Sequence, residues 1–135
     1  MPVKKRGVSV GKLDKNEILQ QYEISGKIIF DSELTGDYKT GNREGRKLLK
    51  IFKLFEKDPV LADECIPLLL ESQNVVVRSK AAAYCLALNR NVDIGEKVLT
   101  EISLNKQYGM WRFNAEMTLK QWYEKGCLIL YLKKE

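Results

Sequence analysis

The sequence contains no histidine. Mechanisms that need an imidazole base, proton shuttle or metal ligand are therefore excluded, among them serine-type triads, papain-like dyads and most zinc enzymes. Only three cysteines are present, and Cys65, Cys85 and Cys127 are too far apart for the close pairs that zinc and redox sites use. We expect three reduced thiols buried in the core of a cytosolic protein. We expect no cofactor and no bound metal.

Long apolar runs are also missing. No stretch approaches the roughly 20 apolar residues that cross a membrane, and residues 1–13 lack the apolar core of a signal peptide. We therefore expect a cytoplasmic protein without a membrane partner. What is present is a chain of 135 residues, 44% apolar and 30% charged, which is the size of one compact domain.

Positive charge is unevenly distributed along the chain. The net charge is +5, but four cations precede the first acidic residue, namely Lys4, Lys5, Arg6 and Lys12. Residues 1–13 also lack helical periodicity, so we predict a flexible basic arm there and a single helical domain over residues 14–135. Because the domain itself is nearly neutral, charge alone is a weak indication of nucleic-acid binding.

Capping and turn signals predict six helices. Asp14 and Glu17 have the spacing of a capping box at the start of the first helix, and a glycine-containing break at residues 35–38 ends it. A second capping box, Asp93 with Glu96, is expected to open the fifth helix. The helices after the first are expected at about residues 39–57, 60–71, 75–88, 93–102 and 108–125.

Three details of these helices carry further expectations. Pro67 should kink or split the third helix, because it removes a backbone donor. Ser25 and Gly26 in the middle of the first helix favour a close crossing by another helix. The apolar tail at residues 127–132 should pack back on the helices, in an extended conformation. Six helices joined by short turns predict an all-α fold, an antiparallel α-α superhelix of the helical-repeat kind.

Residues 74–86, with the run Val77-Arg78 followed by alanines and leucine, resemble the second helix of a HEAT repeat. Residues 36–42 and 114–122 are similar to stretches of a small bacterial HEAT-like family catalogued as a domain of unknown function (family two-thousand-and-nineteen). The resemblance implies an α-α superhelix without an assigned enzymatic activity. In that family the arginine that matches Arg78 is usually structural, and we expect structural roles for Asn42 and Trp122 as well.

The same resemblance implies a function class. Bacterial helical proteins of this kind often bind other proteins, and toxin-neutralising immunity proteins are among them. No carboxylate pair has a spacing suited to acid-base catalysis, and the glycines of residues 36–45 lack the Lys-Ser/Thr of a phosphate loop. We therefore expect a non-enzymatic protein-binding module, in its most specific form an immunity protein for a cognate toxin.

One charge pattern is a candidate binding site. Cations recur every three or four residues along the second predicted helix, at Arg43, Arg46, Lys47, Lys50, Lys53 and Lys57. Such a stripe can meet an acidic protein surface, or follow a nucleic-acid backbone as the alternative function. It is also typical of the solvated face of an amphipathic helix, partly paired with Glu44 and Glu56.

Aromatic residues near the start of the sixth predicted helix form the other candidate. Tyr108, Trp111 and Arg112 could anchor a partner, since such side chains are common at the centres of interfaces. Trp122 is expected in the core. Whether Trp111 lies in the core or at the surface stays open.

Overall fold

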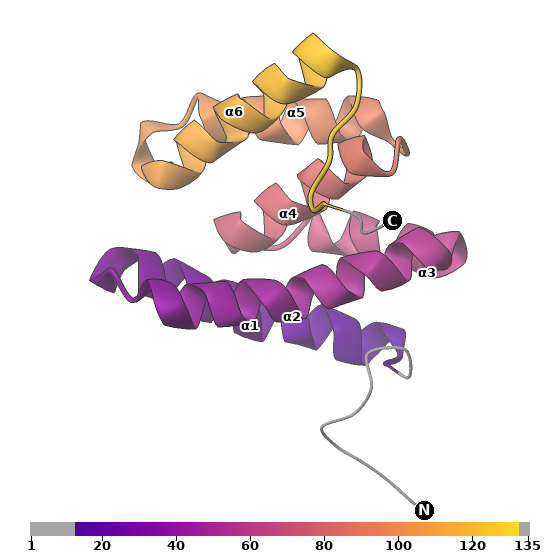
Figure 1. Ribbon diagram of the computed structural model, residues 1–135, viewed down its shortest axis with the longest axis horizontal. Helices are drawn as coiled ribbons and strands as arrows, with labels where there is room; N and C mark the ends of the chain where they lie inside the picture. The colour runs from indigo at the N-terminus through magenta and orange to yellow at the C-terminus, as the bar shows by residue number, and fades with distance from the viewer. Residues whose placement is uncertain (1–12, 133–135) are drawn as a thin grey trace, which may run out of the picture. The chain divides into compact units, whose positions relative to one another are not determined.

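The computed structural model describes residues 13–132, which form six α-helices and one short 3₁₀ helix and contain no strand (Figure 1). The predicted all-α class is confirmed. The chain divides into two compact units, Met1–Leu68 and Leu69–Glu135. Apart from Leu13, the predicted basic arm lies outside the described residues.

Unit 1 contains α1 (Lys15–Thr35), α2 (Tyr38–Lys57) and all of α3 (Pro59–Leu69) except its last residue. The predicted capping box is confirmed, because the Glu17 N–H donates to the Asp14 carboxylate at 2.8 Å and the Asp14 N–H donates to Glu17 at 3.0 Å. The first helix ends at Gly36, whose φ of +78° is one that glycine adopts without strain. Asp37 then caps α2 by accepting from the Thr40 N–H.

A hairpin of α1 and α2 forms the body of unit 1, and the two helices lie side by side in Figure 1. The rings of Tyr22 and Phe55 stack across it with centroids 6.5 Å apart, and the Tyr22 hydroxyl donates to the Leu48 carbonyl at 3.3 Å. Other buried apolar side chains of the two helices are Ile18, Ile29, Ile51 and Phe52. Each large apolar side chain removed from water contributes about 1.5–3 kcal/mol, so this face fixes the hairpin.

Pro67 lies inside α3 without splitting it. The helix continues through the proline and ends at Leu69, two residues later. A proline in the last turn removes a single helical hydrogen bond close to the point where the helix stops in any case. Of the two expected effects, a kink or a split, the split does not occur, and the helix ends two residues earlier than expected.

Unit 2 contains α4 (Val75–Ala87), α5 (Val92–Ser103), η2 (Lys106–Tyr108) and α6 (Met110–Lys125). Asn74 caps α4 as predicted, accepting from two backbone N–H groups of the first turn. The predicted capping box at α5 is wrong, because that helix begins at Val92 after a left-handed Asn91 that makes no side-chain cap. Asp93 consequently lies inside the first turn, where its charge favours the helix N-terminus. Glu96 instead accepts a hydrogen bond from Tyr123 of α6.

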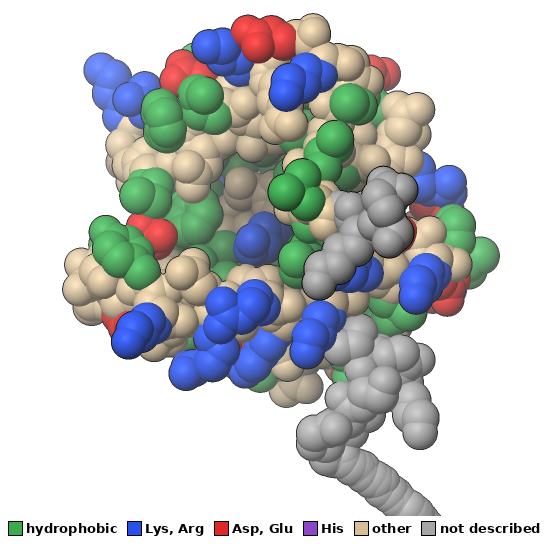
Figure 2. Space-filling model, in the orientation of Figure 1, with side chains coloured by type: hydrophobic (Ala, Val, Ile, Leu, Met, Phe, Trp, Pro, Cys, Tyr) green, Lys and Arg blue, Asp and Glu red, His purple; other side chains and the backbone are tan. Residues whose placement is uncertain are grey.

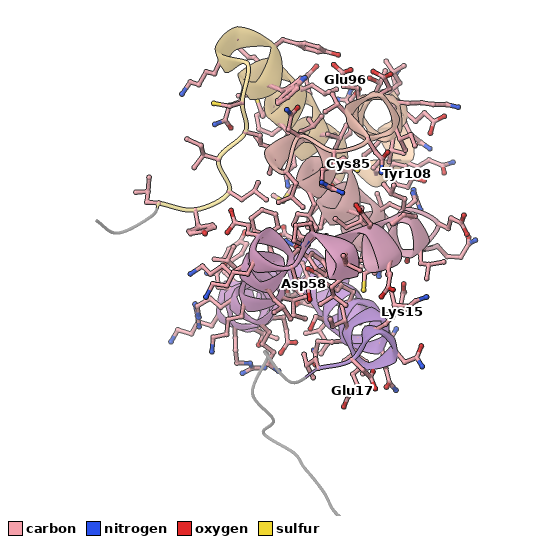
Figure 3. The ribbon with its side chains drawn as sticks, turned by 90° about the vertical axis from the view of Figure 1, so that its right-hand side faces the viewer. Lys15, Glu17, Asp58, Cys85, Glu96 and Tyr108 are labelled. Atoms are coloured by element: carbon pink, nitrogen blue, oxygen red, sulfur yellow. The ribbon has the colours of Figure 1, made fainter. Side chains whose placement is uncertain are left out.

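The helices α4 and α5 approach closely at Gly95. A Cβ at this position would lie 2.7 Å from the Ala82 carbonyl oxygen and 2.8 Å from the Cys85 Cβ. The small residues of α4 make this approach possible, and α6 packs against α5 on the same unit (Figure 3, where Cys85 and Glu96 are labelled). Small side chains at the contact are what close helix packing requires.

The end of the chain departs in part from expectation. Gly126, with φ +70°, ends α6 as predicted. In the apolar tail that follows, Leu128 is buried, but Ile129 is exposed and Leu132 is 91% exposed, so the predicted packing of the whole tail is wrong. Cys127 is exposed too, whereas Cys65 and Cys85 are buried as predicted. No helix within residues 13–132 combines the length and apolar content needed to cross a membrane.

Candidate functional site

The six cations of the predicted stripe are all exposed, and all lie on α2. Figure 2 shows Lys and Arg side chains gathered along this helix. Asn42, on the same helix, is exposed as well. A cationic helix surface is therefore present in unit 1, but its members do not share one environment.

Four of the cations form a straight line along α2, which we call the cation row: Arg46, Lys50, Lys53 and Lys57. At 3.6 residues per turn these positions fall within about 60° of arc and span roughly 16 Å along the helix axis. They lie opposite the buried face that carries Leu48 and Phe55. The packing of α2 on α1 thus points the cation row directly away from the hairpin interior.

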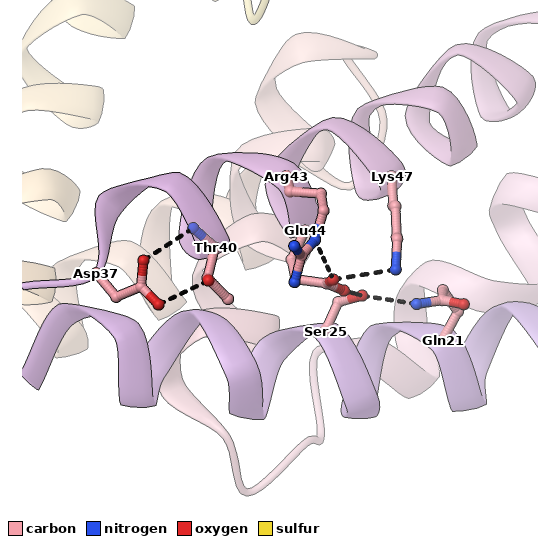
Figure 4. A network of polar contacts seen from close by, with 7 residues as sticks. All are labelled: Gln21, Ser25, Asp37, Thr40, Arg43, Glu44 and Lys47. Carbon is pink, nitrogen blue, oxygen red and sulfur yellow. Dashed lines mark hydrogen bonds and ion pairs between the residues drawn. The ribbon is translucent and has the colours of Figure 1, made fainter. Parts of the chain in front are cut away.

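The other two cations lie on the flank of α2 beside Glu44. Lys47 Nζ is 3.0 Å from the Glu44 carboxylate and Arg43 Nε is 3.6 Å from it (Figure 4). Glu44 is only 2% exposed. A buried carboxylate is costly unless it is paired and hydrogen-bonded, so these two cations have a structural partner.

A polar network extends from Glu44 into α1. The Ser25 hydroxyl donates to Glu44 Oε1 at 2.8 Å, and the Gln21 amide donates to the Ser25 hydroxyl at 2.7 Å (Figure 4). Burial raises the pKa of Glu44. Hydrogen bonds from Lys47, Ser25 and Arg43, together with the charge of Lys47, outweigh this effect, so the net pKa is below its ordinary value. Glu44 is therefore held ionised inside the hairpin.

Sequence reasoning treated Glu44 as a surface acid and missed this network. A signal was present, because Glu44 lies four residues before Leu48 on the apolar side of the helix and Ser25 interrupts the apolar line of α1. The predicted close crossing near Ser25 and Gly26 is confirmed, since both are buried and Ser25 contacts α2. A second close approach lies near the turn, where a Cβ on Gly41 would be 2.6 Å from Ser32 Oγ.

In unit 2, Tyr108 is half-buried and bonded to Arg78. The Arg78 guanidinium donates to the Tyr108 hydroxyl at 2.7 Å and to the Ser72 carbonyl at 3.0 Å, and its carbon lies 5.5 Å from the Tyr108 ring centroid. Arg78 thereby ties α4 to the turn before it and to η2 (Figure 3 labels Tyr108). This geometry gives Tyr108 an internal partner.

The remaining aromatic candidates lie at the start and end of α6. Trp111 and Trp122 are both half-buried, on the side of the helix that carries the buried Ala115 and Leu119. Arg112 is exposed. Further exposed apolar residues on α6, which sequence reasoning did not single out, are Met110, Phe113 and Met117. This surface and the cation row belong to different units, so each is a separate candidate.

Other chemistry is sparse within residues 13–132. No group of three or more histidine, cysteine, aspartate or glutamate side chains is placed to hold a metal ion there. Burial raises the pKa of the Cys65 and Cys85 thiols to about 11, which leaves almost no nucleophilic thiolate at neutral pH. Comparisons of the chain with known protein families, with curated proteins and with solved structures found no match. The family resemblance of the sequence stays a prediction.

Proposed function

We propose that this chain is a non-enzymatic protein-binding helical-repeat module, and in its more specific form an immunity protein that binds and neutralises a cognate bacterial toxin. The observation that carries the binding role is the cation row, which is exposed and points away from the buried face of α2. Aligned cations on a rigid helix attract an acidic partner and speed its encounter. The proposed partner presents an acidic surface.

The toxin-neutralising form of this proposal has separate support. It rests on the resemblance of residues 36–42, 74–86 and 114–122 to a bacterial HEAT-like family. A cytoplasmic location belongs to the proposal and is supported by the three free cysteines, because reducing compartments keep thiols unpaired. The partner would be encoded next to this chain, and a toxin gene immediately upstream is the first observation to seek.

The test is a pull-down from the source cells with the tagged full chain and two double variants. Lys50→Glu with Lys53→Glu reverses two charges of the cation row, and Lys97→Glu with Lys106→Glu reverses two exposed charges of unit 2. We expect one protein partner with the wild type and with the unit 2 variant, and loss of that partner with the row variant. Recovery of no partner under conditions of expression contradicts the proposal.

A second contact is proposed at the start of α6. Trp111→Ala should mainly speed dissociation of the captured partner, whereas Lys50→Glu should slow association by about tenfold at low salt. Trp111 is half-buried, so the melting temperature of each variant is measured first. If Trp111→Ala lowers the melting temperature and leaves dissociation unchanged, Trp111 is packing and the anchor assignment is wrong.

Nucleic-acid binding is the second candidate, favoured by the even spacing of the cation row. It predicts an affinity that falls steeply as salt rises, because each neutralised phosphate releases counterions. Lys50→Glu with Lys53→Glu should then weaken binding and flatten the salt dependence. Absence of both duplex and single-strand binding at low salt excludes this candidate.

A further inference from the structure

We propose that the cation row binds an acidic α-helix of the partner protein, lying alongside α2, and that Arg43 and Lys47 take no part in recognition. This inference rests on the proposed protein-binding function and names the chemistry of the partner. It divides the stripe of six cations into four that contact the partner and two that pair with the buried Glu44 of the same helix.

Contact with the buried Glu44 makes this division. Arg43 and Lys47 approach the buried Glu44, which neutralises part of their charge. In contrast, Arg46, Lys50 and Lys57 form no ion pair with any residue between 13 and 132. Lys53 lies on the same line and is exposed. Contact with Glu44 therefore separates Arg43 and Lys47 from the cation row.

The spacing of the cation row matches a second helix. Its members are separated by four, three and four residues, or about 6, 4.5 and 6 Å along the axis. Carboxylates with the same separations on another α-helix have the same rise, so each can face one cation in either chain direction. In an extended segment every second side chain points to the same face, so side chains on that face are about 6.6 Å apart and fall out of phase with these intervals. The geometry favours an acidic helix over an extended acidic peptide.

The surroundings of the cation row disfavour a nucleic acid. The neighbouring α3 carries no cation and exposes Asp63 and Glu64. A specific duplex interface covers roughly 1,000 Å² or more, and one line of cations along a single helix does not supply it, even with the exposed Lys39 of the same line included. Single-strand binders also need aromatic platforms for successive bases, but both phenylalanines of α2 are buried and Tyr38, at the first position of the helix, is a single exposed ring.

The test uses two synthetic peptides of identical composition and the full chain. One peptide carries four glutamates on a single helical face with separations of four, three and four residues. The other carries the same residues in scrambled order, so that its glutamates point in all directions. Binding is measured by fluorescence anisotropy at low salt, and we expect the ordered peptide to bind at least about threefold more tightly.

Three double variants locate the contact. Arg46→Gln with Lys50→Gln should weaken binding of the ordered peptide by about 2- to 30-fold, the value for two exposed ion pairs. Lys97→Gln with Lys106→Gln removes the same charge from unit 2 and should change the affinity less than about twofold. Arg43→Gln with Lys47→Gln should behave like this control. Circular dichroism checks each fold, and Lys47→Gln alone replaces the last variant if it unfolds.

Each other outcome overturns the inference. Equal binding of the two peptides contradicts recognition of a helical register, and an equal loss of affinity in the unit 2 control contradicts binding at the cation row. If Lys47→Gln weakens peptide binding as much as the row variant does, Lys47 takes part in recognition and the division of the stripe is wrong. An oligothymidine or a DNA duplex that displaces the ordered peptide makes the ligand a nucleic acid. The segment of the cellular partner that contacts the row is identified by crosslinking. If this segment is not an acidic helix, the inference is overturned but the proposed function stands. The absence of any partner overturns the proposed function.

Discussion

Replacement of Ser25 by alanine should destabilise unit 1 more than a change of one hydroxyl suggests. The Ser25 hydroxyl donates to a carboxylate oxygen of Glu44, a residue that is 2% exposed. Without this donor, Oε1 stays buried while Lys47 and Arg43 still approach the other oxygen. An alanine at this position therefore leaves one side of a buried anion without its hydrogen bond.

The expected magnitude follows from the charge of the acceptor. A hydrogen bond to a charged group contributes about 1.5–3 kcal/mol, and the better helix propensity of alanine returns about 0.5 kcal/mol. The net loss in the free energy of unfolding is about 1–2.5 kcal/mol. At roughly 4 °C per kcal/mol for a chain of this size, the melting temperature should fall by about 4–10 °C.

A double-mutant cycle separates this effect from general loss of packing. Glu44→Leu alone should cost little, because the Ser25 hydroxyl can turn to a carbonyl of the preceding helical turn. The double variant, Ser25→Ala with Glu44→Leu, removes both polar partners and should recover most of the stability that Ser25→Ala loses. Chemical denaturation followed by circular dichroism measures all four proteins. A Ser25→Ala variant within about 0.5 kcal/mol of the wild type, or a double variant no more stable than Ser25→Ala, refutes the reasoning.

Acid should remove the same contribution. The pKa of Glu44 is lowered in the folded chain, so its contribution to stability is present above its ordinary pKa of 4.5 and is lost as the pH falls through the folded value. The stability difference between the wild type and Glu44→Leu should therefore change in favour of the variant below that pH. A difference that does not depend on pH contradicts an ionised Glu44.

Three further predictions concern packing, bonding and reactivity. Gly95→Ala should lower the free energy of unfolding by about 1–3 kcal/mol, because the new Cβ meets a backbone carbonyl and another Cβ. Gly45→Ala has open space around the new Cβ and should raise the free energy of unfolding by about 0.5–1 kcal/mol. Thermal melts that rank the two variants in the opposite order contradict the packing described. Tyr108→Phe keeps the ring under the Arg78 guanidinium but loses a hydrogen bond, so it should lower the free energy of unfolding by about 1 kcal/mol. In urea denaturation this loss should be smaller than that of Arg78→Ala, and equal losses contradict a separate contribution of the ring. One thiol, Cys127, should react quickly with a maleimide in the native chain, because burial raises the pKa of the other two to about 11; three fast thiols contradict their burial.

The helix boundaries could be predicted because their causes are local. The capping box at Asp14, the cap at Asn74 and the glycine at Gly126 each act within one turn, and each stands where the sequence predicts it. The start of α5 could not be read in this way. Asn91 adopts a left-handed backbone there, with φ +55°, and the two acids that resemble a capping box lie inside the helix.

The candidate surface was predicted in outline but not in its parts. Periodicity places the cations of α2 on one side, because helical phase is a property of the sequence alone. Which of them form ion pairs depends on the buried Glu44, which accepts a hydrogen bond from Ser25 of α1, 19 residues away in the sequence. Similarly, the hydrogen bond between Arg78 and Tyr108 joins residues that are 30 apart. Contacts between distant residues are decided by tertiary packing, which a single sequence does not display.

The buried network has a consequence for how this surface can change. Ser25 with Glu44, and Gly41 against Ser32, fix the rotation of α2 about its own axis at two points. A turn of the helix by one residue would swing every cation through about 100° without altering a single charge. Contacts in the interior of the hairpin therefore determine the direction in which the positive face of α2 points. A substitution at a fully covered position can redirect the electrostatic field of the surface, so variants with identical surface composition can differ in which partner they meet.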